Sequence, residues 1–102
     1  MKKIFCWLVF FCLASPIFAA EMGVVVVGER GCDRRDRIVI NTNSGYVFAE
    51  VYTGYFSKGD EVVGNLNSYG MKDVLVNGSR ASIWIDDYWL SKAKAAEKCF
   101  RR

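Results

Sequence analysis

The sequence contains no histidine. Histidine is the commonest general base and a frequent metal ligand, so its absence argues against Ser-His or Cys-His catalysis and against imidazole-bound metals.

Neighbouring acids occur at Asp60-Glu61 and Asp86-Asp87. Consecutive strand residues point to opposite faces, so neither pair suits a shared acid-base site. A turn accounts for the first pair and a helix cap for the second. We therefore expect a protein that is not an enzyme and has neither cofactor nor metal, with a small carboxylate-based hydrolase as a remote alternative.

Cysteine and proline are scarce, with four cysteines and one proline in 102 residues. Two of the cysteines lie in an N-terminal segment with the zones of an export signal: Lys2 and Lys3, an apolar run over 4–13, and a small-residue end at Ala19-Ala20. We predict that residues 1–20 are a signal peptide and that residues 21–102 form one small domain, periplasmic or secreted. A retained membrane anchor is the alternative reading.

Charge of one sign is also lacking once that segment is removed. The 14 lysines and arginines include the two near the N-terminus, so 12 remain against 11 acids and the net charge is +1. Only local clustering would then attract nucleic acid or an anionic membrane. A domain of this size buries a limited fraction of its surface, so we expect a covalent cross-link.

Cys32 and Cys99 are the two cysteines left after signal removal, and they lie near opposite ends of the domain. A disulfide between them closes a loop of 67 residues, which in a loop-closure model stabilises the fold by about 4 kcal/mol. Free thiols, an intermolecular bond and a redox pair are the alternatives. A redox pair usually has its cysteines two residues apart, so we predict a structural disulfide.

Short β-branched and aromatic runs separated by glycine-containing turns predict five or six strands. The four consecutive valines of the first run favour a strand buried on both faces. Asn77-Gly78 is the strongest hairpin signal, because a type I′ turn needs positive φ at both positions. The predicted strands span residues 22–27, 37–41, 46–53, 61–66, 72–76 and 80–86.

A helix is predicted at the C-terminal end, capped by Asp86 or Asp87, with Ala93 and Phe100 on its apolar face and Trp89 packed between helix and sheet. The fold class is therefore mainly β (α+β). We expect a small antiparallel β-barrel or strongly curved sheet of 5-6 strands whose open edge or end is covered by the helix. The glycine-punctuated run over 46–66 loosely resembles the oligonucleotide- and oligosaccharide-binding (OB-like) barrel or an SH3-like barrel. This resemblance concerns architecture and implies no activity.

A disulfide between Cys32 and Cys99 would gather basic residues that are distant in sequence. Arginine suits phosphate, sulfate or carboxylate, so this cluster is a candidate anion-binding site. The alternative is a surface neutralised by its own acids, Glu29, Asp33, Asp36 and Glu97. The candidate residues are Arg30, Arg34, Arg35, Arg37, Lys98, Arg101 and Arg102.

Aromatic residues alternate along the strand predicted over 46–53, opposite Val47, Ala49 and Val51. If the aliphatics line the core, the aromatics form an outer platform able to stack on bases or sugars. If the helix covers that face, they are core residues. The candidate aromatic surface comprises Tyr46, Phe48, Tyr52, Tyr55, Phe56, Tyr69 and Trp84.

Together these features predict an exported, non-enzymatic binding protein. Its expected partner is a macromolecule of the envelope or the secreted fraction, which it engages as an interaction or inhibitor protein. The alternative is a nucleic-acid or glycan binder that uses the aromatic strand and the arginine cluster on an anionic polymer.

Overall fold

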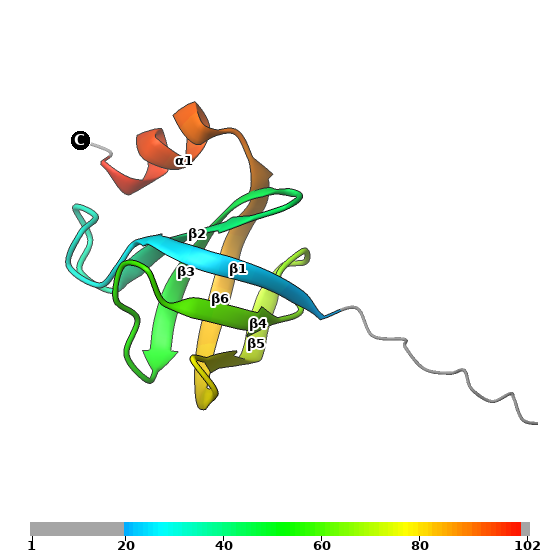
Figure 1. The fold of residues 1–102 in the computed structure, drawn as a ribbon. Coiled ribbons are helices and arrows are strands. Elements are labelled where there is room, and N and C mark those ends of the chain that lie inside the picture. The colour runs from blue at the N-terminus through cyan, green and yellow to red at the C-terminus, as the bar shows by residue number, and fades with distance from the viewer. Residues whose placement is uncertain (1–19, 101–102) are drawn as a thin grey trace, which may run out of the picture.

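The computed structural model describes residues 20–100 (Figure 1). Apart from Ala20, the predicted signal peptide lies outside the described residues. The chain forms six strands and one helix, so the expected mainly β class is confirmed. In order they are β1 (Glu21–Val27), β2 (Arg37–Thr42), β3 (Gly45–Thr53), β4 (Glu61–Gly64), β5 (Gly70–Val76), β6 (Ser79–Leu90) and α1 (Lys92–Cys99).

The strands form a closed antiparallel barrel in the order β1-β2-β3-β6-β5-β4. Closure occurs at β1, where Val24 pairs with Asn41 of β2 and with Glu61 of β4. Every strand therefore has two neighbours and the sheet has no free edge. The expectation was that the helix covers an open edge or end, and the first of these alternatives was wrong because the closed barrel has no open edge.

The barrel interior is filled by alternate residues of the strands. Ile38 and Ile40 of β2, Val47 and Ala49 of β3, and Ile83 of β6 are fully buried. This period of two is the one predicted for the strand over 46–53. The barrel interior is thus a packed apolar core.

The β5–β6 hairpin turns at the predicted Asn77-Gly78. Both residues have positive φ, 49° and 89° respectively, and Val76 pairs with Ser79 across the turn. The two-residue hairpin read from the sequence is confirmed.

Helix α1 begins later than predicted. Its N-cap is Ser91, whose Oγ accepts the backbone N–H of Lys94 at 3.1 Å. The predicted Asp86 or Asp87 cap was wrong because β6 continues to Leu90, which pairs with Tyr46. Within residues 20–100, no helix is long and apolar enough to cross a membrane.

The prediction that Trp89 packs between the helix and the sheet was wrong. The β3–β6 register shifts where Tyr88 and Trp89 face the single residue Val47, and this bulge gives Trp89 a φ of 58°. Its side chain is turned outward and is 65% exposed. The added residue in the bulge explains why helical spacing misplaced this side chain.

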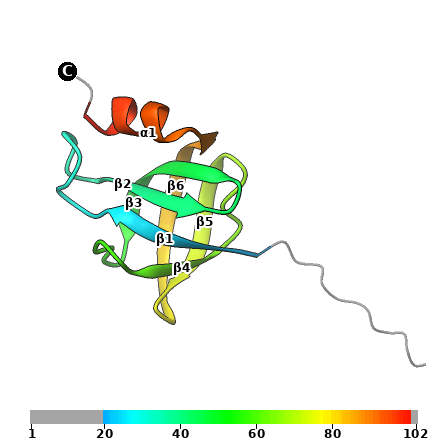
Figure 2. The ribbon, with the colours of Figure 1, turned by 45° about the horizontal axis from the view of Figure 1, so that its top comes forward.

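Helix α1 packs outside the barrel, alongside β2 and β3 (Figures 1 and 2). A second apolar cluster fills this interface: Val39, Phe48 and Ala95 are buried together with Cys32 and Cys99. The two cysteines form the predicted disulfide, with their Cα atoms 4.7 Å apart. Strand β2 is consequently buried on both faces, by the barrel core and by the helix.

Candidate functional site

The disulfide brings the loop after β1 against the end of α1. The backbone N–H of Asp33 donates to the carbonyl oxygen of Cys99 over 2.9 Å. Arg34 and Lys98 line a small hollow of about 120 Å³ beside the disulfide. The predicted juxtaposition of basic segments is therefore present, although its members differ in what they can bind.

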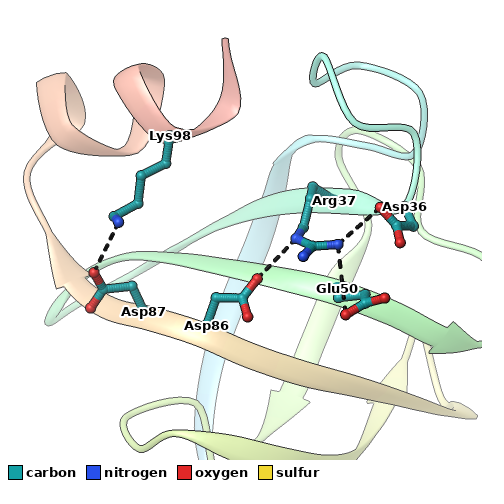
Figure 3. Close-up of polar contacts among 6 residues, drawn as sticks. All are labelled: Asp36, Arg37, Glu50, Asp86, Asp87 and Lys98. Atoms are coloured by element: carbon teal, nitrogen blue, oxygen red, sulfur yellow. Dashed lines mark hydrogen bonds and ion pairs between the residues drawn. The ribbon is translucent and has the colours of Figure 1, made fainter. Parts of the chain in front are cut away.

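Arg37 is not available to an external anion, which corrects its assignment to the anion-binding cluster. Its side chain is 8% exposed and lies among three carboxylates (Figure 3). Nη1 lies 2.9 Å from Asp36 and 3.6 Å from Glu50, and Nε lies 2.9 Å from Asp86. Three carboxylates already surround this single positive charge, so the role of Arg37 is structural.

The carboxyl groups around Arg37 influence each other's protonation. Burial, followed by a hydrogen bond with Asp36, raises the pKa of Glu50 above its ordinary value even though Arg37 opposes the change. Burial also acts to raise the pKa of Asp36. For that group the hydrogen bond with Glu50 and the charge of Arg37 prevail, and the pKa is lowered. The pKa values of these two carboxyl groups are thus shifted in opposite directions, and Glu50 is protonated more readily than Asp36 as the pH falls.

Lys98 is likewise engaged, because its Nζ lies 3.4 Å from the carboxylate of Asp87 (Figure 3). Arg30, Arg34 and Arg35 are exposed and form no ion pair within residues 20–100. The cluster that remains is smaller than the sequence suggested. Arg101 and Arg102 lie outside the described residues.

Two members of the candidate aromatic surface are core residues. Phe48 is 8% exposed and lies beneath α1, and Phe56 is 2% exposed and packs into the barrel core. Tyr46 is partly buried against the helix. These corrections have one cause: α1 covers one half of the outer face of β3, while the loop that follows β3 folds inward at Phe56.

The other candidate aromatics are exposed but belong to separate regions. Tyr52 lies on the half of β3 that α1 does not cover, and Trp84 lies on the adjacent strand β6. Tyr69 lies edge-on to Tyr88, with ring centroids 4.8 Å apart. Tyr55 lines a hollow beside β1. The strand alternation correctly separated the two faces of β3, but these side chains do not assemble into one stacking platform.

A hollow that sequence reasoning missed lies between β1 and α1. Its volume is about 390 Å³, and its lining is mainly apolar, with Val26, Tyr46 and Phe100 among the contributors. Lys58 and Lys92 also line it. The lining residues come from segments far apart in the sequence, and only the closed fold brings them together.

A second hollow, of about 610 Å³, adjoins the first and shares Val26, Val27 and Lys58 with it. Arg30 contributes to the second hollow only. We call the two hollows together the basic groove. The groove lies beside the valine run of β1. The prediction that this run is buried on both faces was wrong, because Val25 is buried in the barrel whereas Val24 is 43% exposed on the outer side.

The charged residues that line the basic groove are mainly cations. Among residues 20–100, one acidic residue lines the groove: Glu29, whose carboxylate accepts the backbone N–H of Phe56 at 2.7 Å and so holds the neighbouring loop. The other charged lining residues, Arg30, Lys58 and Lys92, are cations. An apolar floor with cations along its sides suits a ligand that is apolar and negatively charged. A scan against protein-family models gives no match, and searches of curated proteins and of solved structures give none either.

Proposed function

We propose that this chain is an exported, non-enzymatic binding protein that engages another envelope or secreted protein, as an interaction partner or an inhibitor. The observation that carries the proposal is the basic groove, an uncovered apolar surface bordered by Arg30, Lys58 and Lys92. Apolar surface of this kind marks interaction sites on small soluble domains. The Cys32–Cys99 disulfide supports export, because such bonds persist in oxidising compartments.

Binding of nucleic acid or a glycan is the second candidate function. The exposed rings of Tyr52 and Trp84, on neighbouring strands, favour it. The charge distribution argues against this function. Arg37 and Lys98 already form ion pairs with carboxylates, and Glu50 is the cross-strand neighbour of Trp84 in the β3–β6 ladder. An anionic polymer would meet acidic groups beside these rings. We therefore favour a protein partner.

Affinity capture tests the proposed function. The oxidised protein is immobilised, exposed to envelope extract and eluted with a salt gradient, and the eluate is identified by mass spectrometry. A specific protein retained at high salt is the expected result, because apolar burial is insensitive to screening. Nucleic acid or anionic glycan released at modest salt would favour the second candidate, and capture of neither would contradict both.

A further inference from the structure

We propose that the outer face of β1 and the basic groove together dock one segment of a partner protein in which apolar side chains are interspersed with aspartate or glutamate. This inference rests on the proposed function, that the protein binds another protein. It goes further by naming the surface and the chemistry of the segment that occupies it.

Strand β1 presents the apolar part of the docking surface. Met22 is 57% exposed and Val24 is 43% exposed, and Val26 continues the same outward row into the groove. Met22 pairs with Val63 of β4, which widens the apolar row at its start, whereas Val24 pairs with the exposed Glu61 of β4. Neighbouring β2 also carries an apolar outer residue, Val39, but α1 buries it. On the outer face of β1, Val26 and Val27 are partly buried against the cluster beneath α1, whereas Met22 and Val24 are exposed, so a partner is expected to cover the exposed part.

The groove continues this row toward the helix. Phe100, just beyond α1, is 46% exposed and lines the hollow that also contains Val26 and Val27. The row and the hollow thus form one surface, running from the start of β1 to the end of α1. An extended segment crosses it at about 3.3 Å per residue, so four or five residues span the row over 22–26.

Three cations on three separate segments form the charged part of the docking surface. Arg30 follows β1, Lys58 precedes β4 and Lys92 begins α1. All three are exposed, and none forms an ion pair within residues 20–100. Arg37 and Lys98, which lie outside the groove lining, are matched with carboxylates of the chain itself.

The arrangement of the cations favours a peptide over a lipid headgroup or a phosphate. Lys92 lines the first hollow, Arg30 the second and Lys58 both, so the charges are spread along the groove. A phosphate or a single headgroup concentrates its charge at one point and would be best met by converging donors. Acidic side chains placed along a segment meet separated cations, while the lysine stems extend the apolar floor.

Selection from a phage-displayed library of ten-residue peptides, followed by calorimetry with the enriched peptide, tests the proposal on the oxidised protein. We expect enrichment of sequences combining leucine, isoleucine or phenylalanine with aspartate or glutamate. Lys58→Glu and Lys92→Glu should each weaken binding of the enriched peptide at least tenfold. Lys94→Glu should change it less than twofold, because Lys94 lies outside the groove lining and pairs with Glu97 on the same helix.

Several results would overturn the proposal. They are enrichment of basic or purely polar peptides, no enrichment, equal effects of Lys92→Glu and Lys94→Glu, or tight binding of phosphatidylglycerol vesicles in place of peptides.

Concentration-dependent dimerisation abolished by Lys58→Glu would assign the groove to a second copy of this chain. If Lys58→Glu still captures the envelope protein held by the wild type, this inference fails while the proposed function stands. If the wild type captures nothing, the proposed function fails as well.

Discussion

The guanidinium of Arg37 lies 2.9 Å from the carboxylate of Asp86, an ion pair that joins β2 to β6 across the intervening strand β3. Glu50 of β3 also approaches Arg37, at 3.6 Å. The Nε hydrogen is not aligned for a hydrogen bond, so attraction between opposite charges is the principal contribution of this contact. One side chain thereby links three adjacent strands on the outer face of the barrel.

Replacing Arg37 with methionine should destabilise the fold, because Asp36, Glu50 and Asp86 would then repel one another. We expect the free energy of unfolding to fall by about 2 kcal/mol, less than for a fully buried pair because the carboxylates retain contact with water. Urea denaturation at neutral pH measures this. Arg34→Met is the matched control on an exposed arginine and should change the free energy by less than about 0.5 kcal/mol. Equal effects of the two substitutions would contradict the structural role assigned to Arg37.

The pH dependence of stability should distinguish Glu50 from Asp36. Because the pKa of Glu50 is raised in the folded protein, its ionised form opposes folding at neutral pH. Glu50→Gln should therefore raise the free energy of unfolding at pH 7, by less than about 1 kcal/mol. The gain should shrink as the pH falls through the raised pKa and should be absent below the ordinary value of 4.5.

Asp36→Asn should behave in the opposite way. The pKa of Asp36 is lowered, so its carboxylate stabilises the fold above the ordinary value of 3.8, and that contribution is lost as the pH falls through the lowered pKa. The substitution should reduce stability at pH 7 and have no effect in strong acid. Thermal denaturation of both variants between pH 2 and 7 provides the comparison, and matching pH profiles would refute the distinction.

Loss of the disulfide should be costly and should release the helix. The bond closes a 67-residue loop and its cysteines are buried with Ala95 beneath α1. Cys32→Ala with Cys99→Ala should lower the free energy of unfolding by about 2–4 kcal/mol. Chemical denaturation measures the loss, and faster amide hydrogen exchange at Ala95 and Lys98 would report detachment of α1. An unchanged denaturation midpoint would show that the bond contributes little.

Two glycines with similar backbone angles offer a test of packing. Gly54 and Gly59 have φ values of 93° and 97°, so a side chain at either position is strained. A Cβ at Gly54 would lie 2.6 Å from the Cβ of Ala81, whereas one at Gly59 meets nothing within 4 Å. Gly54→Ala should therefore lower the melting temperature clearly more than Gly59→Ala. Equal losses would mean that backbone strain alone governs both sites.

The strands and the disulfide could be read from the sequence because each leaves a local or countable signature. Alternation identified the inward face of β3, and Asn77-Gly78 identified a hairpin through its need for positive φ. The cysteine pairing followed from there being two cysteines after the predicted signal. Closure of the barrel depends on pairing between β1 and β4, which are distant in sequence, and no local pattern encodes it.

The candidate site was less predictable because it depends on what covers each face. Helical spacing fitted residues around Trp89, but the β6 bulge extends the strand and delays the helix to Lys92. That displacement places α1 over Val39 and Phe48 and leaves Met22 and Val24 on the outer face of β1 exposed. Clustering around the disulfide suggested Arg37 as an anion ligand, and only its approach to Asp86 shows that it is internal.

Site-specific photo-cross-linking in cells that express the protein tests the central claim most directly. A photoreactive residue replaces Lys58 in the basic groove and, in a control, the exposed Trp84 of β6, which lies three strands from β1 in the barrel order. We expect a discrete cross-linked protein from position 58 that is absent from position 84, and that is lost when Lys92→Glu is added. Equal cross-linking at both positions, or none from position 58, would contradict a protein partner held in this groove.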